Sequence, residues 1–325
     1  MSTLAFRCAE EAVRQTGRLA VSAGHVLHWE DWGATGGVPA VVLHGGPGSG
    51  FSAALRRFFD PARYRVVAFD QRGCGRSTPR GETRNNDTAL LIDDIEALRR
   101  HLGIAHWLVV GGSWGATLAI AYAAQHREVV SGMLLRGLFV PSQAELDWFF
   151  QGAAAQFPAA WQRLAAAAPA TAQSDLLTWL GEVFAGPDRL LQRQAALAWL
   201  DWERTLAGAP ATSPSLGDEA LDAAIDRYRV QVHYLAHRCW LDEAGLSNAC
   251  AGVQGLPVQL LHGRADAVCR PAAAWKAHEA MPGSRFRWVE GAGHDPFHPA
   301  MVAAMEDALE VFARQCDFAP KVVSA

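Results

Sequence analysis

One serine lies in a glycine-rich stretch whose residue types suit a nucleophile. Residues 111–115 read Gly-Gly-Ser-Trp-Gly, with an apolar run before them and an alanine-rich run after them. This G-x-S-x-G pattern suits a chain that leaves a strand, turns sharply and enters a helix, because glycines lack the Cβ atoms that would collide at the bend. The serine side chain would then stand exposed at the turn. We therefore predict that Ser113 is the nucleophile of a covalent mechanism.

A serine hydroxyl needs a general base, and the base needs a carboxylate that orients it. Asp266 and His294 each follow a late apolar run and lie at the tip of a loop, in the chain order serine, acid, histidine. Asp295 and His298 are the rival assignments, although His298 lies between a phenylalanine and a proline, which favours a helix start. We predict that Ser113, Asp266 and His294 form a catalytic triad.

A second glycine-rich loop could supply part of an oxyanion hole. The segment LHGGPGSG covers residues 43–50 and ends an apolar run. It contains no G-K-[ST], so a phosphate-binding P-loop is not indicated. We predict that the backbone amides of Gly46 and Trp114 bind the oxyanion, with Gly45 as the alternative to Gly46.

The sequence indicates neither a metal site nor a cofactor. His233 and His237 are four residues apart in a helix-like run, but H-E-x-x-H and a third ligand are missing, which favours packing histidines over zinc ligands. The six cysteines are scattered, with no C-x-x-C pair. We expect reduced thiols in a cytoplasmic protein.

Short apolar runs alternate with helix-like runs in the first part of the chain, which indicates an α/β fold with a mostly parallel, doubly wound sheet. The apolar runs cover residues 39–45, 64–70, 106–112 and 130–137, and the helix-like runs between them cover 90–103 and 116–127. Residues 17–33 suit a two-stranded hairpin that turns at Ala23 and Gly24.

The pattern changes in the middle of the chain. Strand-like runs are missing from about residue 141 to residue 247, where Ala, Leu, Gln and Trp dominate. Strand-like runs return at 256–266 and 284–294, and residues 301–315 suit a final helix. We predict an α/β core formed by residues 1–140 and 248–325, with an inserted helical domain at 141–247.

Charge and hydropathy exclude several classes of protein. The chain has 325 residues and a formal net charge of -4, with no basic cluster that would bind nucleic acid. No apolar run reaches the roughly 18 residues of a membrane span, and the first residues carry charges that a signal peptide would not. We expect a small-molecule or peptide substrate, and neither nucleic acid nor a membrane as a partner. The oligomeric state stays open.

Several motifs together resemble the prolyl iminopeptidases of the α/β-hydrolase superfamily. They are HGGPGSG, DQRGCGRSTP, GGSWGATLA, LHGRAD and GAGHD, in this order, and the resemblance covers roughly residues 20 to 315. It implies the α/β-hydrolase fold with a helical cap over the active site, and an aminopeptidase that removes an N-terminal proline in the cytoplasm without a cofactor. It also implies that Ser113 is the nucleophile, Asp266 the orienting acid and His294 the base.

The resemblance also points to substrate-binding residues, among them Gly45 of the HGGPG loop. Family members hold the free amine of the substrate with glutamates of the cap, and Trp202-Glu203 matches the W-E pair that carries one of them. A second lies in a segment that here reads RVQVHYL, where Gln231 replaces the glutamate and Tyr234 matches the tyrosine. A glutamine offers a hydrogen bond but no charge to an ammonium group.

Three readings of the substrate site stay open. Glu203 alone could hold the amine, or Asp201 or Asp226 could compensate for Gln231. The chain could instead be a related amidase or esterase with a reshaped cap, acting on amino-acid amides, esters or another metabolite. A third reading is a ligand-binding protein of this fold without turnover, although an intact triad argues against it.

Overall fold

The computed structural model describes residues 13–209 and 216–319 and contains one eight-stranded sheet. Its order is β1-β2-β4-β3-β5-β6-β7-β8, and every pair from β4 to β8 is parallel. The strands are β1 (Val13–Ala20), β2 (Val26–Gly33), β3 (Val38–Leu43), β4 (Tyr64–Phe69), β5 (Trp107–Gly112), β6 (Val130–Arg136), β7 (Val258–Gly263) and β8 (Arg285–Val289). This confirms the predicted α/β fold with a mostly parallel sheet. The antiparallel pair β1–β2 is the predicted hairpin.

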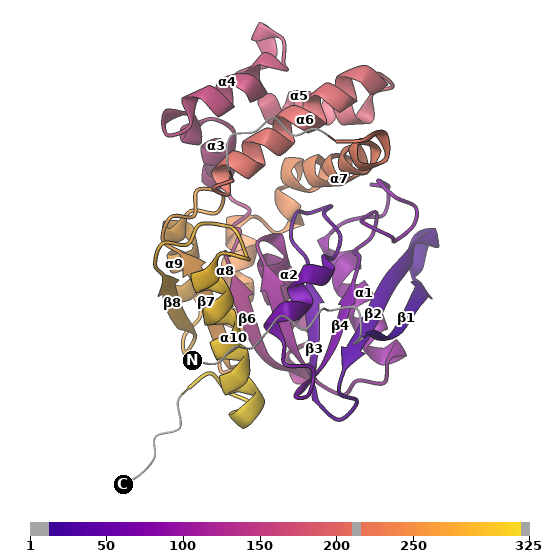
Figure 1. Ribbon diagram of the computed structural model, residues 1–325, viewed down its shortest axis with the longest axis vertical. Coiled ribbons are helices and arrows are strands. Elements are labelled where there is room, and N and C mark those ends of the chain that lie inside the picture. The colour runs from indigo at the N-terminus through magenta and orange to yellow at the C-terminus, as the bar shows by residue number, and fades with distance from the viewer. Residues whose placement is uncertain (1–12, 210–215, 320–325) are drawn as a thin grey trace.

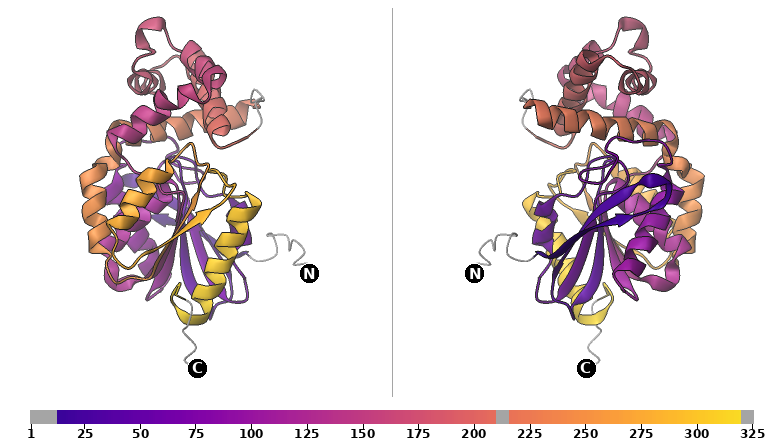
Figure 2. Two further views of the ribbon diagram at one scale, coloured as in Figure 1. Left: turned by 90° about the vertical axis from the view of Figure 1, so that its left-hand side faces the viewer. Right: turned by 90° about the vertical axis from the view of Figure 1, so that its right-hand side faces the viewer.

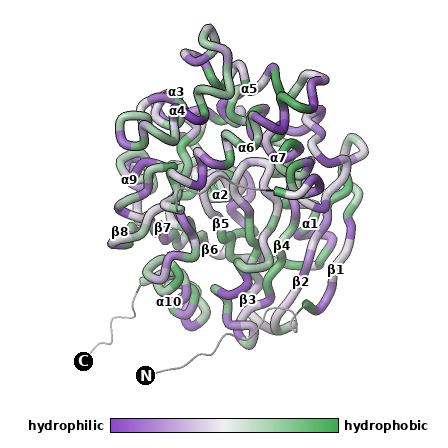
Figure 3. Tube along the Cα trace, turned by 45° about the horizontal axis from the view of Figure 1, so that its top comes forward, coloured by the Kyte–Doolittle hydropathy of each residue, from purple (hydrophilic) through white to green (hydrophobic). Residues whose placement is uncertain are grey.

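The middle strands consist largely of apolar residues (Figure 3), and these are buried on both faces of the sheet. Along β5, Val109 belongs to the hydrophobic core on one side of the sheet, whereas Leu108 and Val110 belong to the core on the other side. This alternation follows from the two-residue period of a strand. Full burial of each such side chain contributes about 1.5–3 kcal/mol, so the continuous apolar runs of the sequence form the centre of the protein.

Helices cover both faces of the sheet (Figure 2). The first core contains side chains from α1 (Thr88–His101), α2 (Trp114–Gln125), α8 (Asp242–Gly252) and α9 (Pro271–Glu279). The second core contains those of α10 (Pro299–Gln315). The sequence had predicted α1, α2 and α10 but not α9, a nine-residue helix between the last two strands.

Five helices stand above one end of the sheet (Figure 1). They are α3 (Gln143–Phe150), α4 (Pro158–Ala166), α5 (Leu176–Ala185), α6 (Arg189–Leu206) and α7 (Asp218–Ala236). They share a hydrophobic core of their own, in which Trp199 stacks on Tyr228 with ring centroids 4.6 Å apart. We propose that residues 141–247 form the cap. The last residues of this range belong to α8, whose Leu246 packs in the core beside the sheet.

Aspartates begin two helices that matter for the site. Asp87 accepts a hydrogen bond from the Leu90 amide at the start of α1, and Asp188 accepts from the first amides of α6. Such N-caps contribute about 0.5–2 kcal/mol each because they satisfy amides that have no partner within the helix. The N-cap residue Asp188 fixes where α6, the helix that carries Glu203, begins. Across the described ranges, no helix is long and apolar enough to cross a membrane.

Candidate active site

Ser113 occupies a sharp turn between β5 and α2. Its backbone angles are φ 57° and ψ -124°, a conformation that side-chain-bearing residues rarely adopt and that costs about 1–3 kcal/mol. The Ser113 amide donates to the Arg136 carbonyl of the neighbouring strand at 2.9 Å, which holds the turn in place. The structure thus places Ser113 where the sequence predicted, at the junction of a strand and a helix.

Two glycines make this turn sterically feasible. A Cβ atom on Gly111 would lie 2.2 Å from the Gly115 carbonyl oxygen, and one on Gly115 would lie 2.1 Å from the Leu43 carbonyl oxygen. Both distances are far inside van der Waals contact, and both neighbours are backbone atoms that no rotamer change can move. The pattern G-x-S-x-G is therefore needed for the close approach of β3, β5 and α2.

We expect Gly115→Ala to lower the free energy of unfolding by about 1–3 kcal/mol or more, because the added methyl group forces the backbone of α2 away from β3. Urea unfolding followed by circular dichroism measures the change. Gly36→Ala is the matched control, since a Cβ atom at Gly36 would meet nothing within 4 Å; its effect should stay within about 0.5 kcal/mol. Equal stability of the two variants would contradict this account of the turn.

Asp266 and His294 meet in the loops that follow β7 and β8. His294 Nδ1 donates to Asp266 Oδ2 at 2.7 Å, and Asp266 Oδ1 accepts from the amides of Val268 and Cys269 at 3.0 and 2.8 Å. Burial opposes ionisation of Asp266, but the imidazole and these hydrogen bonds outweigh it and hold its pKa below the ordinary value. The carboxylate is therefore charged at neutral pH and fixes the ring of His294, leaving Nε2 for another partner.

The end of β6 lies beside His294. Arg136 is buried, and its Nη1 donates to the His294 carbonyl at 2.7 Å. A Cβ atom on Gly137 would lie 3.3 Å from His294 Nδ1, so the backbone runs directly beside the ring. Sequence reasoning missed Arg136. Its signal was a charged residue that ends an otherwise apolar strand.

Cys269 connects the serine to the acid. The Cys269 Sγ lies 3.9 Å from Ser113 Oγ, and the Cys269 amide donates a hydrogen bond to Asp266 Oδ1. Arg136 likewise accepts from the Ser113 amide and donates to the His294 carbonyl, so the loops of Asp266 and His294 lie near the turn of Ser113. That the three residues form a triad stays a prediction. Burial raises the pKa of the Cys269 thiol well above its usual value, which leaves the thiol protonated at neutral pH.

The rival residues have other partners. Asp295 Oδ1 accepts from the Phe297 amide at 2.9 Å, and His298 Nδ1 accepts from the Ala300 amide at the start of α10. His298 therefore caps a helix, as its neighbours in the sequence suggested. Of His294 and His298, His294 is the one that forms a hydrogen bond with Asp266.

The loop after β3 passes beside the serine. A Cβ atom on Gly45 would lie 3.2 Å from Ser113 Cβ, whereas one on Gly46 would meet atoms of the loop itself. Trp114 is the first residue of α2, where backbone amides have no partner within the helix. The structure therefore places Gly45 and Trp114 next to Ser113. That the amides of this loop and of Trp114 bind an oxyanion stays a prediction.

A buried glutamine connects this loop to the turn. The Trp114 indole donates to Gln71 Oε1 at 3.0 Å, and Gln71 Nε2 donates to the His44 carbonyl at 2.9 Å. The Gln71 amide donates to His44 Nε2, so His44 Nδ1 carries the proton and donates to the Gly45 carbonyl. These hydrogen bonds hold the glycine loop and Trp114 in a fixed relation. The segment DQRGCGRS, which begins with Asp70, therefore holds the glycine loop and Trp114 together through its Gln71.

Glu203 lies in the cap and already has three hydrogen-bond donors. Arg227 Nη2 donates to it at 2.6 Å, the Tyr228 hydroxyl at 2.9 Å and Gln231 Nε2 at 2.5 Å. The structure thus brings together Glu203 and Gln231, both predicted to bind substrate. No pattern in the sequence indicates that Arg227 pairs with this carboxylate.

Trp202 and Tyr234 are fully buried. The Trp202 indole donates to the Phe149 carbonyl inside the cap core. Tyr234 packs against Trp114, with ring centroids 5.3 Å apart, and its hydroxyl donates to Asn86 Oδ1. Both residues pack and orient other parts of the site, and their predicted contact with substrate stays a prediction.

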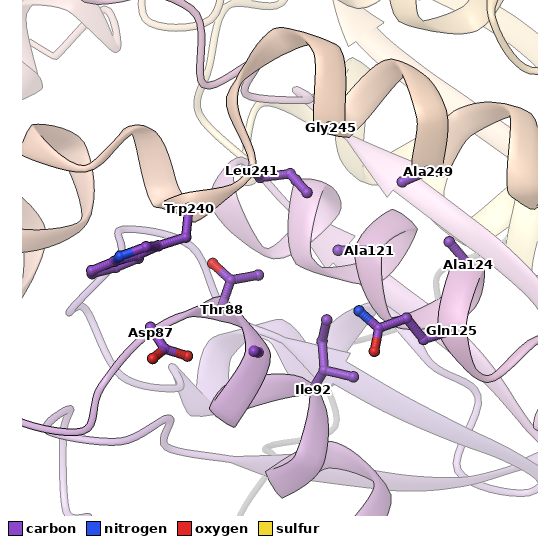
Figure 4. Close-up of a pocket in the computed structure, with 11 residues that line it drawn as sticks. Asp87, Thr88, Ile92, Ala121, Ala124, Gln125, Trp240, Leu241, Gly245 and Ala249 are labelled. Carbon is purple, nitrogen blue, oxygen red and sulfur yellow. The ribbon is translucent and has the colours of Figure 1, made fainter.

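The two histidines weighed as metal ligands, His233 and His237, have other partners. No group of three or more His, Cys, Asp or Glu side chains suited to a metal occurs in residues 13–209 and 216–319. His233 contacts the Asn86 carbonyl, and the ring of His237 stacks on Trp240. A cavity of about 350 Å³ lies between α1, α2 and α8, with Trp240 at one end and Gln125 at the other (Figure 4), and none of the predicted site residues lines it.

Comparison with known proteins gives one consistent result. A protein family described as alpha/beta hydrolase fold matches residues 39–300. A probable proline iminopeptidase from Leptolyngbya boryana is 39% identical over 93% of the chain and 95% of its own length, and the proline iminopeptidase from Xanthomonas citri is 39% identical over 92% and 96%. The crystal structure of the esterase RhEst1 from Rhodococcus sp. ECU1013 has a TM-score of 0.61 at 21% identity, over 93% of this chain and 99% of that one. This structural likeness concerns the fold.

Proposed function

Because the chain belongs to the proline iminopeptidase family of α/β hydrolases, we propose that it is an aminopeptidase that releases proline from the N-terminus of small peptides. It is a serine hydrolase. The observation that carries the proposal is the Asp266–His294 pair beside the strained turn of Ser113. The relatives supply the reaction, and this geometry supplies the groups that could perform it.

The proposed mechanism follows from the roles of these groups. Ser113 Oγ attacks the carbonyl carbon of the proline residue while His294 Nε2 takes its proton. Asp266 holds the imidazole by Nδ1 and stabilises its positive charge, and the amides of Trp114 and Gly46 bind the oxyanion. His294 then protonates the leaving amine, and an acyl-enzyme remains. A water molecule, deprotonated by His294, releases proline and restores Ser113.

The test is kcat/KM on the p-nitroanilides of proline, alanine and leucine. We expect proline to be preferred by about tenfold or more, which equals roughly 1.4 kcal/mol of transition-state discrimination. If p-nitrophenyl acetate is hydrolysed but no anilide is, the protein is not an aminopeptidase.

One observation favours a second candidate, an amidase or esterase for other small substrates. Gln231 is neutral, and the nearby carboxylate of Glu203 is paired with Arg227. A site of this kind offers less charge to a free amino terminus than two unpaired glutamates would. Turnover of leucine or alanine anilides at a rate equal to that of proline would support this candidate instead.

A further inference from the structure

The cap acids that could hold an amine all have arginine partners. Glu203 pairs with Arg227 at 2.6 Å, and Asp201 pairs with Arg163 at 2.7 Å. Asp226 lies 3.0 Å from Arg80 and 3.1 Å from Arg229. Each carboxylate is therefore already balanced by a positive charge of the protein. An ammonium group that approached any of them would compete with a guanidinium group.

Glu203 is the one of these acids that contacts Gln231. Its Oε2 accepts from Arg227 and Tyr228, and its Oε1 accepts from Gln231 Nε2. Charge-assisted hydrogen bonds of this kind are strong, and the pair of Glu203 and Arg227 has no net charge. The role left to Glu203 is to hold the amide of Gln231 in one orientation.

Two polar atoms beside Glu203 remain without a partner. Within the described part of the chain, Gln231 Oε1 and Arg227 Nε are both buried and make no hydrogen bond. Gln231 itself is 4% exposed. An unsatisfied buried polar group destabilises the protein, so a ligand that bonds to these atoms recovers that free energy. One of them is an acceptor and the other a donor.

The helix α7 directs these residues toward the candidate active site. The Arg227 carbonyl lies against Gly48 of the glycine loop, where an added Cβ atom would come within 2.3 Å of it. Tyr234 packs on Trp114, next to the nucleophile. Gln231 is four residues after Arg227 and three before Tyr234, and this spacing places all three on one face of the helix. Gln231 therefore lies on the face of α7 that contacts both parts of the predicted oxyanion site.

We propose that Gln231 Oε1 and Arg227 Nε form an uncharged recognition site for the N-terminal end of the substrate. The inference rests on the proposed hydrolase function and specifies its substrate class. Gln231 accepts one hydrogen bond from a substrate N–H, whether that nitrogen is a protonated amine or a neutral amide. Arg227 Nε can donate to a carbonyl next to a neutral N–H. The site therefore accepts substrates whose terminal nitrogen is acylated or part of a lactam as well as free amines.

The physical reason is the balance of charge. A buried ammonium group needs a compensating negative charge, because a neutral acceptor replaces little of its hydration. The carboxylate next to Gln231 is that of Glu203, and Arg227 offsets its charge. A neutral lactam loses less hydration on entry, and it offers a donor for Gln231 Oε1 and an acceptor for Arg227 Nε, the two buried atoms beside Glu203 that have no partner among the described residues. A free amine consequently gains no decisive advantage here.

Binding of two ligands with the same five-membered ring tests the proposal. L-prolinamide carries a protonated amine near neutral pH, whereas L-5-oxoprolinamide carries a neutral lactam N–H and a carbonyl. Calorimetry on the full-length Ser113→Ala protein gives the Kd of each without turnover. We expect the two Kd values to agree within about tenfold. Binding of prolinamide more than about tenfold tighter, or no measurable binding of the lactam, would overturn the proposal.

Two variants and a control locate the effect. In the Ser113→Ala background, Gln231→Glu adds a carboxylate, and Arg227→Met removes the charge that balances Glu203. At least one of them should shift the ratio of the two Kd values by about tenfold or more toward prolinamide. Gln156→Glu, at an exposed position of the cap, should leave the ratio unchanged. If neither variant shifts the ratio, Gln231 and Arg227 do not recognise the substrate terminus. Hydrolysis of proline p-nitroanilide by the unmodified protein reports on the proposed function separately.

Discussion

Replacement of Ser113 by alanine is expected to lower kcat for proline p-nitroanilide by about a millionfold. The variant keeps the oxyanion site and the cap but has no atom that can form the acyl-enzyme, and loss of a triad nucleophile typically costs this much. Steady-state kinetics at enzyme concentrations high enough to detect the residual rate provide the measurement. A fluorophosphonate probe should label the unmodified protein and leave the variant unlabelled.

Cys269→Ala is the matched control for this prediction. Its Sγ lies 3.9 Å from Ser113 Oγ, so it is the other nucleophilic atom at the turn. Burial raises the pKa of its thiol, and a thiol that stays protonated is a poor nucleophile. We expect this variant to keep its activity within a few-fold. If Cys269→Ala lost activity and Ser113→Ala kept it, Cys269 and not Ser113 would be the nucleophile.

Asp266→Asn is expected to lower kcat by about ten thousandfold while the fold is retained. An asparagine of the same shape cannot hold His294 in the tautomer that leaves Nε2 free to accept a proton, and it cannot stabilise the imidazolium. The buried position makes the loss larger than for an exposed pair, because no water replaces the carboxylate. Steady-state kinetics on the same anilide measure the change.

The same variant should alter how stability depends on pH. The pKa of Asp266 is lower in the folded protein than its ordinary value. The ionised carboxylate therefore stabilises the fold above that ordinary value, and this contribution is lost as the pH falls through the folded pKa. Urea unfolding at neutral and acidic pH should show a smaller loss of stability on acidification in Asp266→Asn. Full activity in Asp266→Asn would remove it from the triad.

The parts of the site that the sequence predicted are those fixed by local geometry. Ser113 could be found because a turn this sharp requires glycines on both sides, and glycine spacing is visible in a sequence. His294 and Asp266 could be proposed because each follows one of the last two strands, β8 and β7. In a parallel sheet such loops meet at one edge, so the strand pattern alone brings them together.

The parts that the sequence did not predict depend on side chains from distant segments. The pairing of Glu203 with Arg227 joins α6 to α7, and no spacing rule predicts which of many arginines will reach a given carboxylate. Arg136 was missed because its guanidinium group contacts a loop 158 positions further along the chain. Helix α9 was missed although its initial proline and its alanines favour a helix, because it is only nine residues long and lies between two strands.

The contacts of α7 have a consequence for exchanging parts between relatives. This one helix carries Gln231 and Arg227, touches the glycine loop at Gly48, and packs on the residue after the nucleophile through Tyr234. A chimera that imports a foreign cap with its own α7 would carry over the substrate preference and also disturb the alignment of the reacting groups. Successful recombination therefore needs its crossover points placed so that α7 and residues 44–50 come from the same parent.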